Sequence, residues 1–421
     1  MFASYRRILA LPGALAFTLA GLLARLALSM SGVATVTLIA DRRGSYALAG
    51  AVSAAGLAAV AVGMPLLGRL VDRHGQARVA VPAVLGSSVP LAGLLLCTRF
   101  GAPAWTLFAC WALASGVPNL GGMARARWAH LLQADEAARH LANSLEQALD
   151  ELCFMAGPVL AVLLCRAFFP EAGLLVSGVL CAAGVLLFAA QRGTEPPVRP
   201  AVRRAAHRPE GGSGPAGRGL RVLLPAFLAT GVVFGAMEVT TIAYTDALGH
   251  GSAAGPLLAL VAAGSCASGL FLGLVRPRRS AAVRLLAGAG AMAGLLLLPA
   301  AAGLAGAGPW VLGAALFVAG SGTAPTMVSG MTLVQEVVPA ERLNEGMSAA
   351  VSAIVVGISA GSALGGAVAQ RAAPGTGYWV PAGAAATALL IVAAGLPVLR
   401  RPAGRAAQAA EMRGTPVGAG G

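Results

Sequence analysis

The sequence contains no lysine, and all 30 of its basic residues are arginines. This absence excludes a P-loop, in which a lysine binds the phosphates, and an enzyme that forms a Schiff base through lysine. Charged residues make up only 11% of the chain, against about 25% in typical soluble domains. The composition therefore argues against direct ATP drive and against a soluble fold.

The sequence is also poor in metal-binding patterns. Its six cysteines lie in apolar stretches without CxxC spacing, and its five histidines show no ligand spacing. Cysteines in such surroundings usually act as small hydrophobic residues. We therefore expect no metal, no cofactor and no enzymatic activity.

Long apolar stretches dominate the chain, of which 57% is hydrophobic. About 18 consecutive apolar residues are enough to cross a bilayer as a helix. Twelve stretches qualify, at 12–40, 46–67, 79–98, 104–124, 142–166, 172–190, 220–245, 254–275, 283–304, 309–334, 344–370 and 377–399. The sequence predicts an all-α membrane protein with twelve transmembrane helices.

The arginines are distributed unevenly between the two sides of these stretches. Of the 30, 24 fall on alternate connections or on the span ends beside them. The others are Arg25 within the first stretch and Arg42, Arg43, Arg99, Arg166 and Arg371 on the opposite side. Because arginine-rich connections stay in the cytoplasm, we expect a plasma-membrane protein with both termini cytoplasmic. The net charge of +14 then reflects topology and attraction to lipid headgroups, and predicts no nucleic-acid partner.

The chain divides into two halves with six predicted spans each. Residues 191–219 are rich in proline, glycine and arginine, a composition typical of disordered linkers. Similar segments begin at Ser115 and Ser321, in the fourth span of each half, and repeated halves are common in secondary transporters. We expect one bundle over 1–190, a cytoplasmic linker over 191–219, a second bundle over 220–400, a cytoplasmic tail over 401–421, and a monomer.

A charged hairpin, GRLVDRHGQAR, separates the second and third stretches. A helical hairpin with arginines reaching the interface would explain its charge but not its acid. Its pattern resembles the signature loop of the major facilitator superfamily, through Gly68, Asp72, Arg73, Gly75 and Arg78. That resemblance implies a rocker-switch transporter in which the loop is a latch between the halves. Asp72 would then face the start of the eleventh span, near Asn344 and Glu345. Gln76 and Ala77 stand where the family has basic residues, a departure expected to weaken the latch.

A second motif lies in the fifth stretch. Gly157 and Pro158 in AGPVLAVLL resemble the superfamily motif associated with efflux by antiport, although Ala161 and Val162 replace its second glycine pair. A glycine–proline kink without a role in direction is an equally open interpretation. The superfamily arginine of the fourth span is replaced by Ala112. Arginine without lysine, together with abundant glycine and alanine, is typical of high-GC bacterial genomes such as those of actinobacteria.

Ionisable residues within predicted spans are candidates for function because each is costly in lipid unless paired or hydrated. The first span contains Arg25, and the fifth contains Glu146, Asp150 and Glu151. The two spans are neighbours in the fold that the resemblance implies. We therefore predict an ion pair between Arg25 and either Asp150 or Glu151.

The seventh stretch contains Glu238 with no basic residue near it in sequence. A buried, unpaired carboxylate can exchange protons, so Glu238 is a candidate site for a proton or a cationic substrate. A hydrogen-bonded structural acid is the alternative. Asn119 is a further candidate on the wall of the pathway, together with Trp111, Met123, Tyr244 and Thr326.

These observations favour a proton-coupled exporter of a drug or small organic metabolite, similar to such exporters of the superfamily. The partners would be a small-molecule substrate, protons and the lipid bilayer. Two alternatives stay open: an importer of a small organic solute, and a membrane sensor that keeps the scaffold without transport.

Overall fold

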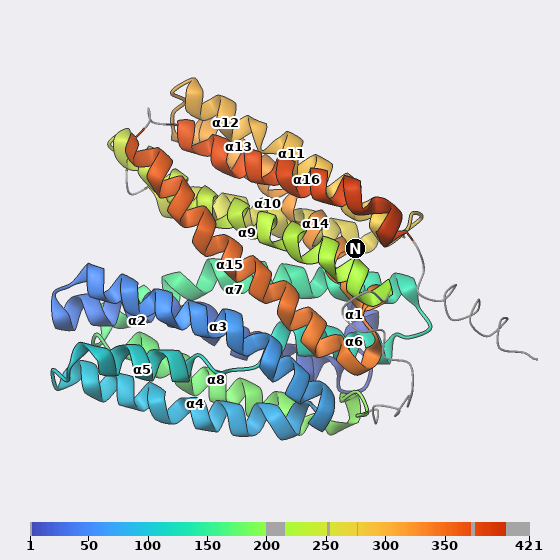
Figure 1. The fold of residues 1–421 in the computed structure, drawn as a ribbon, viewed down its shortest axis with the longest axis horizontal. Helices are drawn as coiled ribbons and strands as arrows, with labels where there is room; N and C mark the ends of the chain where they lie inside the picture. Colours follow the sequence, from blue (N-terminus) through green and yellow to red (C-terminus); the bar gives the residue numbers. More distant parts are fainter. Residues whose placement is uncertain (1, 199–214, 251–252, 276, 372–374, 401–421) are drawn as a thin grey trace, which may run out of the picture.

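The structure is a computed structural model, and it describes every residue except 1, 199–214, 251–252, 276, 372–374 and 401–421. The described chain is helical (Figure 1). The first half contains α1 (Phe2–Leu9), α2 (Ala14–Arg43), α3 (Tyr46–His74), α4 (Gln76–Arg99), α5 (Ala104–Ala114), α6 (Leu120–Leu131), α7 (Glu136–Ala167) and α8 (Ala172–Ala190). The second contains α9 (Pro215–Ala247), α10 (Ala254–Leu274), α11 (Ala281–Leu295), α12 (Leu297–Leu304), α13 (Pro309–Gly320), α14 (Thr323–Val337), α15 (Leu343–Arg371) and α16 (Trp379–Leu399).

Eleven helical segments in the described part are long and apolar enough to cross a membrane. In this count α11 with α12, and α13 with α14, each form one segment. Large apolar side chains such as Val89 and Trp310 are exposed on the outside, as expected for a surface that faces lipid. The chain is a multi-pass membrane protein.

The expected span at 104–124 is where the structure differs from the prediction of twelve. It is broken into α5, which ends at Ala114, and α6, which begins at Leu120. Pro118 disfavours helical backbone at the residue before it, and the Asn119 side chain accepts a hydrogen bond from Gly122 N as the cap of α6. Neither piece alone has the length and hydropathy of a span.

The expected linker is shorter than the composition predicted. Residues 192–194 form a short 3-10 helix, and α9 begins at Pro215, so both ends of the 191–219 segment have regular structure. Its central part, 199–214, and the tail 401–421 lie outside the described residues.

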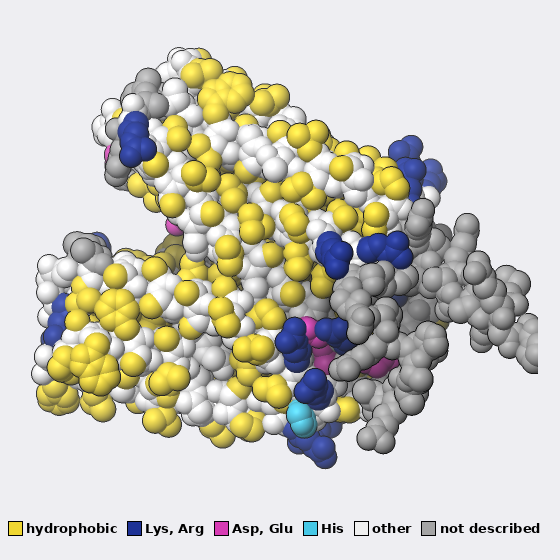
Figure 2. Space-filling model, in the orientation of Figure 1, with side chains coloured by type: hydrophobic (Ala, Val, Ile, Leu, Met, Phe, Trp, Pro, Cys, Tyr) yellow, Lys and Arg dark blue, Asp and Glu magenta, His cyan; other side chains and the backbone are white. Residues whose placement is uncertain are grey.

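The two halves meet at one end of the molecule and separate at the other (Figure 1). The Gly75 end is where α3 turns into α4, and the Gly44 end is where α2 turns into α3. Gly75 has φ +96° and Gly44 has φ +63°, conformations that favour glycine. Figure 2 shows a wedge-shaped hollow between the halves at the Gly44 end, whereas basic side chains gather at the Gly75 end. The space between the halves is therefore open on one side.

Candidate functional site

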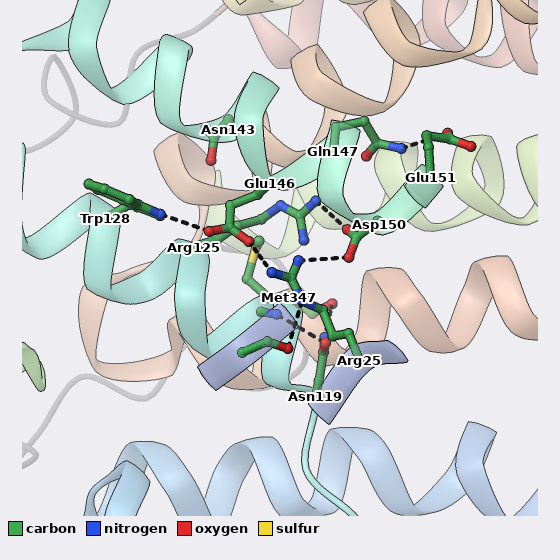
Figure 3. Close-up of polar contacts among 12 residues, drawn as sticks. Arg25, Asn119, Arg125, Trp128, Asn143, Glu146, Gln147, Asp150, Glu151 and Met347 are labelled. Carbon is green, nitrogen blue, oxygen red and sulfur yellow. Dashed lines mark hydrogen bonds and ion pairs between the residues drawn. The ribbon is translucent and has the colours of Figure 1, made fainter. Parts of the chain in front are cut away.

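Four charged side chains form a cluster in the first half of the molecule (Figure 3). Arg25 of α2 forms ion pairs with Glu146 and with Asp150 of α7, each at a distance of 2.8 Å. Arg125 of α6 pairs with the other Asp150 oxygen at 2.7 Å. Asp150 thus lies between two guanidinium groups and joins three helices.

The local sequence explains how these groups meet. Glu146 and Asp150 are four residues apart, which puts them on the same face of α7. Glu146 is fully buried and accepts a further hydrogen bond from Trp128 Nε1 at 2.8 Å. Two positive and two negative charges make the cluster neutral, and buried charges are tolerated when they are paired in this way.

The predicted pair between Arg25 and Asp150 is present, and Glu146 is a second partner of Arg25. Arg125 was missed because its position near the expected end of the fourth span suggested only a cytoplasmic charge. The signal that could have found it is its spacing from Trp128: the two are three residues apart and share a face of α6. Both side chains are buried.

Glu151 was the alternative partner of Arg25, and it lies apart from the cluster (Figure 3). Its carboxylate accepts hydrogen bonds from Gln147 Nε2 at 3.0 Å and from Ser265 Oγ at 2.8 Å. Ser265 belongs to α10, so this buried acid joins the two halves of the molecule.

Asp72 makes another contact between the halves, at the Gly75 end. One oxygen accepts hydrogen bonds from Asn344 N at 3.0 Å and Asn344 Nδ2 at 2.8 Å, and the other accepts from Glu345 N at 2.8 Å. These backbone groups form the first turn of α15, whose free N–H groups and dipole favour an anion. The acid lies against the start of the eleventh span, the position that the resemblance implied.

Gly68, the first glycine of the hairpin, allows this contact between α3 and α15. A Cβ at Gly68 would lie 2.7 Å from Asn344 O and 2.9 Å from Glu345 Cα, so only glycine lets α3 approach α15 here. Arg73 and Arg78 are exposed, and no hydrogen bond or ion pair holds either side chain in the described part. Instead, Arg69 and Arg342 bind Glu345.

Gln76 and Ala77 are held by contacts that do not reach the second half, so their expected weakening of the latch stays a prediction. The Gln76 side chain is buried, donates to Met123 O at 3.1 Å and accepts from Arg127 Nε at 2.8 Å. Ala77 N donates to Glu195 Oε1 at 3.0 Å. The Gln76 amide and the distant Glu195 thus hold the first turn of α4. The sequence pattern alone could not reveal these contacts.

Further contacts reinforce the Gly75 end. Asn143 Nδ2 donates to Gln335 Oε1 at 2.9 Å, and Gln335 Nε2 donates to Arg125 O at 3.3 Å. Tyr5 of the short helix α1 donates to Leu270 O at 2.7 Å, across the halves. This short helix was not predicted from the sequence.

Gly157 and Pro158 lie within an unbroken α7. Gly157 faces α2, where an added Cβ would collide with Ser29. Ser29 Oγ donates to Cys153 O at 2.8 Å, a hydrogen bond from α2 to α7 beside this glycine. The motif therefore provides close packing between α2 and α7, and its connection with direction stays a prediction.

Two further candidates, Glu238 and Asn119, differ in their surroundings. Glu238 is exposed, and its side chain has no hydrogen-bond or ion-pair partner among the described residues. Asn119 is buried at the break of the fourth span, where it caps α6 and donates to Met347 O at 3.5 Å. Asn119 therefore joins the halves and does not line the wedge.

Comparison with known families agrees with this architecture. Residues 17–315 match the family described as the Major Facilitator Superfamily. The chain belongs to the major facilitator superfamily. The match covers more than half of the sequence, including the charge cluster and the hairpin at Gly68. No curated protein sequence matches the chain.

Solved structures of superfamily members share its fold. A human organic anion transporter, MFSD10 (TETRAN), matches with a TM-score of 0.69 at 15% identity over 92% of this chain and 99% of that one. A bacterial homologue of the iron transporter ferroportin, in an outward-facing state, matches with 0.69 at 18% identity over 91% and 98%. The E. coli fucose:proton symporter FucP matches with 0.67 at 15% identity over 92% and 99%. At these identities the likeness concerns the fold alone.

Proposed function

We propose that this superfamily member exports a drug or small organic metabolite in exchange for protons. The observation that carries the proposal is the difference between the two ends: polar contacts join the halves at the Gly75 end, and a wedge separates them at the Gly44 end (Figure 2). Alternating access requires a state of this kind, open on one side of a substrate site between the halves.

The arginine distribution supports an orientation. The Gly75 end carries most of the arginines, and positively charged connections stay in the cytoplasm. In this orientation the wedge opens outward, and the bonds of Asp72 to α15 hold the cytoplasmic side closed. We infer that an exporter in this state has released its substrate and is ready to take up protons.

Glu238 is the acid that we assign to the pathway. Glu238, Ile242 and Asp246 are exposed at four-residue intervals on α9, so they share one stripe of the helix. A charged side chain that faces lipid within a span costs about 3 kcal/mol or more. This cost favours a position of Glu238 on the wall of the wedge. An unpaired carboxylate there can bind a cationic substrate or a proton in turn. This competition would couple the two fluxes.

The experiment uses everted membrane vesicles with an acidic interior, in which a pH-sensitive dye reports the proton gradient. Lipophilic cations, neutral antibiotics and small organic acids are added in turn. A substrate should dissipate the gradient, and Glu238→Gln should abolish the response to cations. Asp246→Asn is the matched control, because Asp246 is also an exposed acid, two turns farther along the same helix. This variant should keep the response to cations. Asp72→Asn should reduce it by loosening the closed end.

The opposite results would decide between the alternatives. If no compound moves the gradient in everted vesicles but a solute does so in right-side-out vesicles, import replaces export. If neither preparation responds while the protein is abundant and folded, transport itself is excluded for the panel. In both cases the assigned role of Glu238 is wrong.

A further inference from the structure

The hydrogen bonds between the described residues of α7 and α10 end at Glu151. They begin at the Gly75 end, and in order they join His140 with Leu272, Ala148 with Cys266, and Glu151 with Ser265. Beyond Glu151, no residue in the described part of α7 makes a hydrogen bond to α10. Among the described residues, Glu151 therefore makes the hydrogen bond of this interface that lies farthest from the Gly75 end.

The two oxygens of Glu151 have different surroundings. Oε1 accepts the hydrogen bonds from Ser265 and Gln147. Thr323 Oγ1 lies 2.8 Å from both Ser265 Oγ and Gly320 O, so its single hydroxyl proton is shared between these two acceptors. Oε2 has no hydrogen-bond partner among the described residues, and it is not among the fully enclosed polar atoms without one. One oxygen thus holds the interface while the other stays accessible.

No cation in the described part of the chain pairs with Glu151. The charged group beside it on α7 is Asp150, which is occupied by Arg25 of α2 and Arg125 of α6. Among the described residues, α10 contributes the Cys266 thiol as a titratable neighbour, and α14 contributes the Thr323 hydroxyl. Glu151 is therefore a carboxylate held by neutral donors within the bilayer, where an unpaired charge is costly.

We propose that Glu151 is the proton-responsive contact that links protonation to the opening of the Gly75 end. A hydronium ion in the wedge gives its proton to Oε2 and leaves as water. Hydrogen bonds to a charged acceptor are roughly twice as strong as those between neutral groups, so protonation weakens the bonds from Ser265 and Gln147. The α7–α10 contact loosens, and the wedge-open state loses stability relative to the opposite state.

This inference rests on the proposed export in exchange for protons. It adds which conformational change the proton drives. In an exporter that has released its substrate outward, the proton must drive the return to the cytoplasm-facing state. Uptake of a proton from the wedge by Glu151 weakens the α7–α10 contact on the cytoplasmic side, and this favours the return to the cytoplasm-facing state. Glu238 would then serve substrate exchange, and Glu151 would serve the conformational change.

The test measures distance without any substrate. Spin labels replace Trp105 of α5 and Trp310 of α13, which are 70% and 91% exposed at the Gly44 end, in a variant without the six native cysteines. Double electron–electron resonance in lipid nanodiscs gives the distance distribution across the wedge from pH 5 to 8. We expect acid to shift the distribution toward shorter distances, because the wedge closes as the Gly75 end opens.

Glu151→Gln should show the short-distance population at every pH and lose the pH-dependent shift. Ser265→Ala, which removes one donor but keeps the acid, should raise the short-distance population at neutral pH. Asp246→Asn is the control and should behave as the unsubstituted protein. A pH-dependent shift that persists in Glu151→Gln overturns the proposal, as does the absence of any shift in the parent protein.

If Glu151→Gln does not fold, Ser265→Ala decides, and an unchanged distribution at neutral pH contradicts the proposal. The distance shift can succeed where vesicle transport fails, which would reject the proposed substrates or direction but keep the role of Glu151. Transport that depends on Glu238, without any distance shift, would reject the role of Glu151 alone.

Discussion

The two halves have the same helix order but hold equivalent helix pairs together by different means. In the first half, α2 and α7 are joined through the ion pairs of Arg25 with Glu146 and Asp150. In the second half, the corresponding helices α9 and α15 approach through glycines. Gly357 lies against Leu228 O, and Gly231 lies against Ile354 O, so closely that a Cβ would collide with backbone.

The difference shows that this helix pair does not need charge to pack. Small residues let helices approach closely and are sufficient for association in membranes. Buried ion pairs, by contrast, add little net stability because removing their charges from water is costly. The first half keeps its charges next to Glu151, at the depth where the wedge begins, and this placement fits a role in function better than a role in packing.

The largest effect should come from breaking the charge cluster. Arg25→Ala and Asp150→Ala each leave buried charges without partners, and each should lower the free energy of unfolding by about 3–5 kcal/mol. The double variant should lose less than the sum, by about 0.5–3 kcal/mol. Unfolding in detergent micelles measures these losses, with exposed Arg166→Ala on α7 as the control. Additive losses would mean that the pair is not energetically coupled.

A smaller effect should follow from disturbing the glycine contact of the second half. Gly357→Ala places a methyl group on Leu228 O and should cost about 1–3 kcal/mol, the usual range for overpacking. Gly366→Ala is the matched control on the same helix, because its Cβ would lie 3.6 Å from Val239 Cγ1, an ordinary contact. Comparison of the two thermal midpoints removes the effect of helix propensity. Equal midpoints would show that close packing does not hold α9 to α15.

The smallest effect concerns a charge pair at the Gly44 end, outside the spans. Arg42 binds Glu171 through two hydrogen bonds of 3.0 Å. Burial of the Glu171 carboxyl opposes its ionisation, but the hydrogen bonds and charge of Arg42 outweigh this and lower its pKa below the ordinary value. The pair therefore stabilises the protein above the pKa of the unfolded chain, and this contribution is lost as pH falls through the lowered pKa.

Glu171→Gln should remove this part of the acid dependence and change the thermal midpoint slightly near neutral pH. Half-exposed pairs contribute little and are screened by salt. Thermal midpoints between pH 3 and 7, at low and high salt, check the prediction. An effect as large as that of Asp150→Ala would contradict the view that the cluster of Arg25, Arg125, Glu146 and Asp150 contributes more than this pair.

Much of this molecule could be predicted from particular residues. The apolar stretches, the break at 191–219 and the arginine distribution gave a membrane protein in two halves. The spacing of Gly68, Asp72 and Gly75 indicated the superfamily and the contact of Asp72 with α15. Arg25 and Asp150 were predicted to pair because an ionisable residue within lipid requires a partner.

Other features depended on contacts between residues far apart in the chain. Arg125 looked like a cytoplasmic charge until the break at Pro118 turned α6 inward toward Asp150. The hydrogen bond from Ala77 to Glu195 spans more than a hundred residues, so no local pattern could reveal it. Glu238 was expected to be buried because its neighbours in sequence are apolar, but its side chain is exposed.

The sequence by itself determined which segments enter the membrane and which residues cannot stay there without a partner, because both follow from the free energy of transfer into lipid. Only the tertiary structure decided which partner each charge finds, and where the halves are joined. Those outcomes depend on the packing of helices that lie more than a hundred residues apart in the chain, as with Glu151 and Ser265, and the hydrophobicity of the sequence does not encode that packing.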